Sequence, residues 1–473
     1  MKARQMEINL MKNAIPRLLS EEEQTWNTIK QVEEMEDQRL KMWWYSEVPG
    51  SGAPERLIIA AMQDMENRGL DVTAAESWID PGLKAWKAED MESLHRITAR
   101  IFRELFQAPQ NRKDPYWSYE EFQSWEQYAD CVSFPKAYAV DIEDNSFIDK
   151  IHAGWLAQII AGAIGTAMEG YTTDQLLKTF GEVKNYLRKP NTFNDDITYE
   201  LAFLKAFSEK GYEITAADIA DEWVALIPFG WSAEDIALRN LKLGIYPPES
   251  GIRSNPFYEW IGAQMRGAIC GMVAPGNPKE AARLAWMDGS ISHYNNGIIG
   301  EVFNAMMVSM AFGEKNVRKI LIQSIDLIPE TSEYYQVITF ALHQCQQHHK
   351  WLDAWRICEE KYARYNWIHA YPNAAAEVIA LWYGNGNFNE TMEIIALAGQ
   401  DVDCNAAQVA TVLGIVLESE GIDDKWKKPI GDDLDTYVRG MKKMTISGLT
   451  EWTVQSIKRA KEGEQLNENS RNR

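Results

Sequence analysis

Cysteine is scarce in this 473-residue chain, and long apolar runs are missing. An odd number of widely separated cysteines is typical of a reducing compartment rather than of a disulfide framework. No segment approaches the roughly eighteen consecutive apolar residues of a membrane-spanning helix, and residues 1–40 lack the apolar centre of a signal peptide. The sequence therefore predicts a cytoplasmic protein with no membrane segment. The cysteines are Cys131, Cys270, Cys345, Cys358 and Cys404.

Positive charge is in deficit as well. The chain has 48 Lys and Arg against 69 Asp and Glu, which gives a formal net charge of −21. Nucleic acids and anionic membranes attract basic surfaces and repel a strongly acidic body. We therefore expect neither partner, although one local basic pocket for a phosphate stays compatible with the charge. The sequence leaves the oligomeric state open.

Strand-type alternation of β-branched residues is also scarce, whereas apolar residues recur every three or four positions along most of the chain. This periodicity predicts an all-α protein. The expected helices include 57–68 and 91–105 near the start, 258–269 in the middle, and 197–207 and 406–417 after two acidic clusters. Small residues recur from Ala153 to Gly165, which is typical of a buried helix that neighbouring helices approach closely.

The same patterns predict three parts of the chain. Residues 1–140 form an N-terminal helical extension, residues 145–420 a compact helical domain of catalytic size, and residues 421–473 a C-terminal segment whose polar end is expected to be disordered. The first part is rich in tryptophan. Such rings can stack on sugars or bases, but packing inside a helical array is the favoured interpretation. The tryptophans of this part include Trp43, Trp44, Trp78, Trp86, Trp117 and Trp125.

Two acidic clusters stand directly before predicted helices. Asn194, Asp195 and Asp196 follow a loop-forming stretch, while Asp401 and Asp403 follow Gly399 some two hundred residues later. Carboxylates at a helix N-terminus are stabilised by the helix dipole without any ligand, so one cluster alone would favour simple capping. Two such clusters facing each other would supply the hard oxygen ligands that Mg²⁺ prefers, and could hold one or two divalent cations.

Four motifs in this order give the chain, from about Ile151 to Leu417, a resemblance to the ADP-ribosylglycohydrolase family. The first is the small-residue helix 161–165 followed by Glu169, and the second is Asn194-Asp195-Asp196. The third is the middle segment with Ser254-Asn255-Pro256, residues 262–266 and residues 292–297. The fourth is Gly399-Gln400-Asp401-Val402-Asp403-Cys404.

The resemblance implies an all-α fold, a binuclear Mg²⁺ centre, with Mn²⁺ as the alternative ion, and hydrolysis of a glycosidic bond to ribose in a small-molecule or ADP-ribosylated substrate. It implies that Glu169, Asp196 and Asp403 carry catalysis. It also implies a cleft lined by Asn255, Gly262, His293 and Asn296. The implied metal ligands are Asn194, Asp195, Asp196, Asp401, Asp403 and Cys404.

Three positions depart from the family pattern. Asn194 stands where an ionic or hydroxyl ligand is usual, Cys404 replaces a threonine hydroxyl by a sulfur that Mg²⁺ disfavours, and Gly162 stands where an aspartate is usual. The N-terminal extension is absent from minimal members. Two alternatives therefore stay open, namely cleavage of another N-, O- or C-glycoside, and a non-enzymatic binding protein that keeps the fold.

Overall fold

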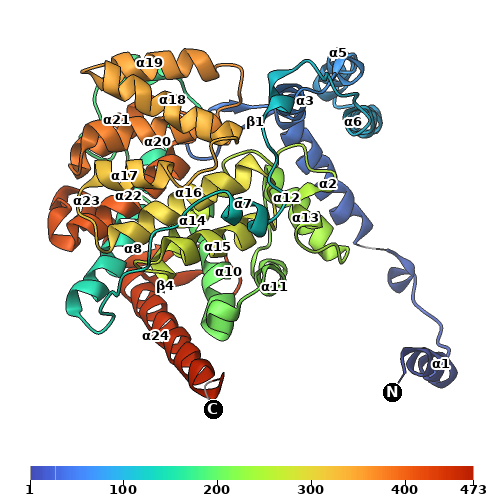
Figure 1. Cartoon of the computed structure of the whole chain (residues 1–473). Coiled ribbons are helices and arrows are strands. Elements are labelled where there is room, and N and C mark those ends of the chain that lie inside the picture. Colours follow the sequence, from blue (N-terminus) through green and yellow to red (C-terminus); the bar gives the residue numbers. More distant parts are fainter. Residues whose placement is uncertain (1, 27, 472–473) are drawn as a thin grey trace.

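The computed structural model describes residues 2–26 and 28–471, with side chains as far as Gly463. The regular secondary structure of its described residues is almost all helical, which confirms the all-α prediction (Figure 1). The strands found there form two short antiparallel pairs. β1 (Ser46–Glu47) pairs with β2 (Pro54–Glu55), and β3 (Asp433–Asp435) pairs with β4 (Lys443–Thr445).

The N-terminal extension falls into an outlying arm and a packed part. α1 and the beginning of α2 extend away from the body in Figure 1, and apolar side chains such as Leu10, Ile15 and Trp26 are exposed there. From Leu40 onward the chain packs, and the Trp44 Nε1 donates a buried 2.8 Å hydrogen bond to Thr98 Oγ1. The helical elements are α1 (Ala3–Asn13), η1 (Glu22–Gln24), α2 (Ile29–Trp44), α3 (Leu57–Asn67), α4 (Thr73–Glu76), α5 (Ile79–Lys87), α6 (Met91–Leu105), η2 (Pro115–Ser118) and α7 (Trp125–Asp130).

Two helices pack antiparallel along their lengths in the main body. α8 (Asn145–Gly165) and α22 (Val402–Leu417) are buried along most of their lengths. Their close approach depends on glycine, because a Cβ on Gly414 would lie 2.2 Å from the Ala153 carbonyl oxygen, and one on Gly165 would lie 2.2 Å from the Asp403 nitrogen. The small-residue segment is thus a buried packing face, as the sequence predicts.

The other helices surround this pair (Figure 1). They are α9 (Thr173–Phe180), α10 (Asp195–Lys210), η3 (Gly211–Glu213), α11 (Ala216–Leu226), α12 (Ser232–Lys242), α13 (Glu249–Ile252), η4 (Gln264–Arg266), α14 (Gly267–Val273), α15 (Pro278–Gly289), α16 (Asn296–Ala311), α17 (Val317–Ile325), α18 (Glu333–Gln347), α19 (Trp351–Tyr362), α20 (Ala370–Gly384), α21 (Phe388–Ala398) and η5 (Ser419–Gly421).

The predicted helix over 258–269 is wrong for its first half. Residues 254–263 are irregular, and the helical conformation starts with η4 and α14. The Ile261 amide donates to the Ile368 carbonyl at 2.8 Å, and the Ala370 amide donates to the Glu259 carbonyl at 3.2 Å. These backbone groups are therefore satisfied by a neighbouring segment, so no helical turn is needed there.

The C-terminal segment covers the outside of α8. It contains α23 (Asp424–Ile430), β3, β4 and α24 (Ile446–Arg471). α24 packs on α8 and α10, and the Trp155 Nε1 donates to Thr453 Oγ1 at 3.0 Å. The expected disorder concerns about the last ten residues, whose side chains lie outside the described part, and it stays a prediction. The domain boundaries near 140 and 420 stay predictions too.

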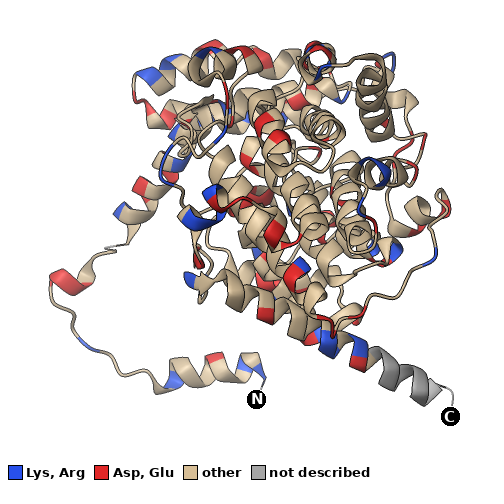
Figure 2. Cartoon of the chain, turned by 90° about the vertical axis from the view of Figure 1, so that its left-hand side faces the viewer, with Lys and Arg blue, Asp and Glu red and all other residues tan. Residues whose placement is uncertain are grey.

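The described helices carry charged residues of both signs and include no candidate membrane span, as expected from the sequence (Figure 2). Acidic and basic residues are interspersed along the helices in Figure 2. None of the described helices combines the length and the apolar character that crossing a bilayer requires.

Candidate metal centre and cleft

A sharply bent loop leads into α22, whose start packs against the end of α8. Gly399 and Gln400 both have positive φ angles, +78° and +70°. A Cβ on Gly399 would lie 2.3 Å from the Tyr171 carbonyl oxygen, so this bend requires glycine. The Asn373 Oδ1 then accepts from the Asp401 amide at 3.0 Å and from the Asn405 Nδ2 at 2.9 Å. These contacts fix the second acidic cluster at the start of a helix.

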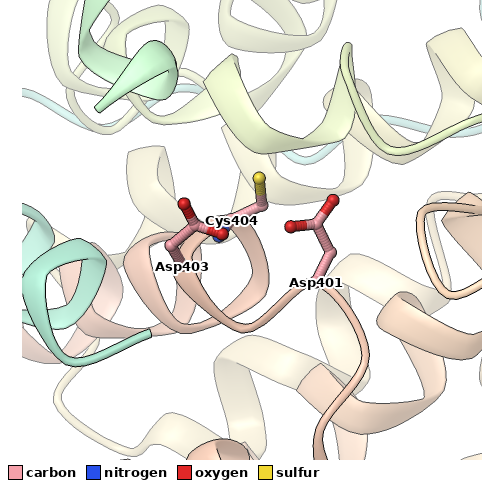
Figure 3. A group of neighbouring side chains, drawn as sticks. All are labelled: Asp401, Asp403 and Cys404. Carbon is pink, nitrogen blue, oxygen red and sulfur yellow. The ribbon is translucent and has the colours of Figure 1, made fainter. Parts of the chain in front are cut away.

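Three side chains of this cluster converge. One ligand atom from each of Asp401, Asp403 and Cys404 lies within 4.8 Å of the other two, and all three residues are buried. Figure 3 shows the two carboxylates and the sulfur projecting to the same side of the α22 N-terminus. In the part of the chain that the structure describes, this is the one group of three or more His, Cys, Asp or Glu side chains with such spacing. The donors His343, Cys345, His348 and His349 form no such group.

The first acidic cluster lies beside the second. Asn194 caps α10, because its Oδ1 accepts from the Asp196 amide at 2.6 Å, and its Nδ2 donates to the Asp403 Oδ2 at 3.4 Å. The amide thus joins the two clusters. Asp195 begins α10 and lines the same cavity as Asp403.

Asp196 is the least satisfied member. It is 1% exposed, and neither carboxylate oxygen accepts a hydrogen bond of ordinary geometry, although the Cys404 thiol lies close enough to lower its pKa slightly. A buried carboxylate without partners is costly. A bound cation would remove that cost. The unsatisfied carboxylate of Asp196 therefore fits a metal site.

The carboxyl groups disfavour one another's ionisation. Burial raises the pKa of Asp195 to about 6, and the charge of Asp403 contributes to the rise. Burial, followed by the Asp403 charge, raises the pKa values of Asp196 and Asp401 well above the ordinary range. The pKa of Glu169 rises for the same two reasons. A divalent cation among these groups would reverse each shift, because an opposite charge favours the ionised form.

A cavity of about 760 Å³ opens above this cluster. Its floor includes Glu169, Asn194, Asp195, Asp401, Asp403 and Cys404. Gly262 lies in its wall, where a Cβ would lie 1.9 Å from the Glu234 Oε1. The volume is that of an ordinary small-molecule site.

Asn255, His293 and Asn296 lie behind this wall rather than in it. The Asn255 Nδ2 donates to the Gly251 and Ser292 carbonyls, each at 2.8 Å. The Asn296 Nδ2 donates to Glu259 Oε1 at 2.9 Å. His293 is 0% exposed, and burial lowers its pKa well below the ordinary value. These three side chains are not among those that line the cavity, and their role in substrate binding stays a prediction.

Glu234 is a cavity residue that sequence reasoning missed. It stands in the first turn of α12, where its Oε1 lies 3.3 Å from the Arg266 Nη1 and 3.9 Å from the His293 Nε2. Burial raises its pKa to about 7, against the opposing charge of Arg266. A glutamate in the first turn of a helix carries no local signal of this role, since Arg266 reaches it only in the folded chain.

Glu55 and two large aromatic rings were missed as well. Glu55, Trp231 and Trp367 line the cavity, and Glu55 comes from the N-terminal extension. Their joint position follows from contacts between segments far apart in the sequence, so their local sequence patterns could not reveal it.

Comparison with known proteins assigns the chain to one family. A family model described as ADP-ribosylglycohydrolase matches residues 143–461, more than half of the chain. No curated protein matches. Among solved structures, the chain is similar to one titled "ADP-ribosylglycohydrolase-related protein complex". Their sequence identity is 15%, the match covers 67% of this chain and 99% of the other, and the TM-score is 0.48.

Proposed function

Because the chain belongs to the ADP-ribosylglycohydrolase family, we propose that it is a divalent-metal-dependent hydrolase that cleaves a glycosidic bond to a ribose-like sugar, with an ADP-ribosylated substrate as the leading candidate. The observation that carries this proposal is Asp196, a buried carboxylate that accepts no hydrogen bond of ordinary geometry and lies beside the converging Asp401 and Asp403. Family membership supports a glycohydrolase-type function, and the metal, the substrate and the site residues are our proposal.

The donor set fits a hard divalent cation. Asp195, Asp196, Asp401 and Asp403 supply carboxylate oxygens, and the site is large enough to keep solvent or sugar hydroxyls as further ligands. Asn194 and Cys404 stand at the outer positions. Because the thiol of Cys404 is a poor partner for Mg²⁺, we expect Mn²⁺ to bind more tightly than Mg²⁺. When bound, such ions would orient the 2′ and 3′ hydroxyls of a ribose and offset negative charge at the site.

Glu169 is the proposed base. Its carboxyl is buried beside Asp401 and Asp403 and lines the cavity floor. Once the charge of its acidic neighbours is balanced, its pKa falls toward the ordinary value, and it can accept a proton from the water that attacks the anomeric carbon. The glycosidic bond breaks in the same reaction, and the leaving group departs with the electron pair and takes up a proton. The remaining carboxylates would stabilise an oxocarbenium-like transition state by their negative charge.

A substrate panel tests the proposal. The full-length protein is incubated with ADP-ribosyl-arginine, ADP-ribosyl-serine, nucleosides and aryl ribosides, in Mg²⁺, in Mn²⁺ and in excess chelator. We expect turnover of at least one ribosyl substrate that chelator abolishes. Asp196→Ala and Asp403→Ala should abolish turnover while the fold stays intact, whereas the exposed α19 residue Asp353 serves as a matched control, with Asp353→Ala unchanged. Normal turnover in either site variant would sink the assignment.

A second candidate is hydrolysis of another N-, O- or C-glycoside. It is favoured by the N-terminal extension, whose residues supply part of the cavity wall and so alter the space beyond the sugar. A crystal soaked with Mg²⁺ and ADP-ribose separates the two candidates, because it reveals whether the adenosine half has a place to bind. The third alternative is a binding protein without activity. It predicts no turnover of any member of the panel, with or without a divalent ion.

A further inference from the structure

The β1–β2 hairpin of the N-terminal extension is docked against the metal-site region. The Gly50 carbonyl accepts a 2.6 Å hydrogen bond from the Arg188 Nη1, and the Ser51 carbonyl accepts one of 3.2 Å from the Tyr171 hydroxyl. A Cβ on Gly50 would lie 2.2 Å from the Thr166 carbonyl oxygen and 2.7 Å from the Glu169 Oε1. The turn of the hairpin therefore rests directly on Glu169, and the strands form part of the cleft wall.

Glu55, at the end of β2, is a buried carboxylate in this wall. It is 7% exposed. The Trp231 Nε1 donates to both of its oxygens, at 3.1 Å and 3.0 Å, and the Ser46 hydroxyl donates to its Oε2 at 3.3 Å. Burial raises its pKa to about 6, and these hydrogen bonds oppose the rise. Among the side chains that the structure describes, in residues 2–26 and 28–463, none of Lys, Arg or His forms an ion pair with Glu55. Its negative charge is thus hydrogen-bonded but not neutralised.

Aromatic rings also line this cavity, and one of them, Trp231, contacts Glu55 directly. Phe229 and Trp231 have ring centroids 6.0 Å apart, and both line the cavity together with Trp367. A cation over an aromatic face gains from the ring quadrupole, and the gain is larger where water is excluded. A carboxylate without a cation beside such rings is complementary to a positively charged group.

The other charged wall residues do not fill this role. Glu234 is already paired with the buried Arg266, at 3.3 Å. Arg188 and Lys189 line the cavity too, but both are exposed, and the Arg188 guanidinium is held by the carbonyl oxygens of Gly50 and Thr166. Glu55 is therefore the buried wall charge that a bound molecule can neutralise.

We propose that Glu55 is a specificity-determining residue, which accepts hydrogen bonds from a cationic group of the ammonium or amidinium class in the leaving group of the substrate. The proposal rests on the hydrolase function proposed above, because it assigns the leaving-group end of that same cleft. Glu55 lies outside residues 143–461, the segment that the family model matches. The extension would thus add to the family's site a recognition element of its own.

Calorimetric titration of the full-length protein with benzamidine tests this assignment without requiring turnover. Benzamide, its neutral isostere, is the comparison ligand, and excess Mg²⁺ keeps the amidinium from the acidic floor. In the wild-type protein we expect benzamidine to bind at least about tenfold more tightly than benzamide, as a charge-assisted hydrogen bond requires. If the wild-type protein binds benzamidine and benzamide with nearly equal affinity, the proposal is overturned, whatever the variants show.

The variant comparison locates the effect. Glu55→Gln keeps an oxygen that can accept from Trp231, so we expect native stability and a loss of about tenfold or more in benzamidine affinity, with benzamide affinity unchanged. Glu66→Gln removes the same charge from an exposed position on α3 and should bind benzamidine as the wild type does. Equal benzamidine affinity in Glu55→Gln and wild type would refute the role of Glu55. The substrate panel and this titration fail independently, so an inactive protein that still discriminates benzamidine through Glu55 would sink the hydrolase function alone.

Discussion

Replacing Gly165 by alanine tests how closely α8 approaches the start of α22. A Cβ at this position would lie 2.2 Å from the Asp403 nitrogen, 2.3 Å from the Asp403 Cα and 2.4 Å from the Val402 carbonyl carbon. All three neighbours are backbone atoms, so no side-chain rotation can relieve the contact. Ordinary contact begins at 3.4 Å, which means that the start of α22 must retreat by about 1 Å. That movement would shift the Asp403 carboxylate relative to Glu169.

The cost follows from packing. Overfilling a tightly packed contact costs about 1–3 kcal/mol, and because Gly165 is the last residue of α8, the gain in helix propensity from alanine is small there. We expect a loss of about 1–3 kcal/mol in the unfolding free energy, measured by urea denaturation, together with weaker divalent binding.

Gly463→Ala is the control for this substitution. It makes the same change in α24, where nothing lies within 4 Å of the added Cβ. Alanine there should leave stability unchanged or raise it by up to about 1 kcal/mol. Gly165→Ala as stable as the wild type would refute the close approach and the site geometry that depends on it.

Three further predictions concern charge and ligand chemistry. Asp196→Asn should raise the unfolding free energy of the metal-free protein at neutral pH by about 1 kcal/mol or more, because burial raises the pKa of Asp196 well above its ordinary value and so favours the unfolded state, where this carboxyl ionises freely. The same variant should abolish divalent binding by calorimetry, and a less stable variant that still binds metal would contradict both parts. Cys404→Thr should strengthen Mg²⁺ binding by about tenfold, because a hydroxyl oxygen replaces sulfur, and unchanged affinity would remove the thiol from the site. Burial raises the pKa of Glu377 to about 8 from 4.5, so the folded state holds this proton more tightly than the unfolded state, and the contribution of Glu377 to stability is lost as pH rises from about 4.5 to 8. Its size is about 5 kcal/mol at most, and Glu377→Gln should flatten the fall in unfolding free energy over that range, whereas an unaltered pH profile would contradict the shift.

The sequence predicted the floor of the site better than its walls. Asp195 and Asp403 lie in the first turns of two helices, and that placement is readable because helix starts carry local signals such as Asn194 and Gly399. The close approach of α8 to the start of α22 rests on Gly165, which belongs to a small-residue stripe visible in the sequence. The all-α fold followed from periodicity alone.

The walls depend on contacts that have no local pattern. Glu55 and Trp231 are 176 positions apart and meet only because the hairpin docks on the main body. Arg266 holds Glu234 through a buried network, which spacing along the chain does not encode. The helix predicted over 258–269 failed for a related reason, since Ile261 bonds to Ile368 instead of continuing a helical turn.

The acidic starts of α10 and α22 together form, in our proposal, one metal-dependent hydrolytic site. The most direct measurement is release of the sugar from the best ribosyl substrate of the panel, by the wild-type protein and by Asp403→Ala, with Mn²⁺ and with excess chelator. We predict turnover only for the wild-type protein with the divalent ion. Turnover that persists in chelator, or in Asp403→Ala, would contradict the proposal.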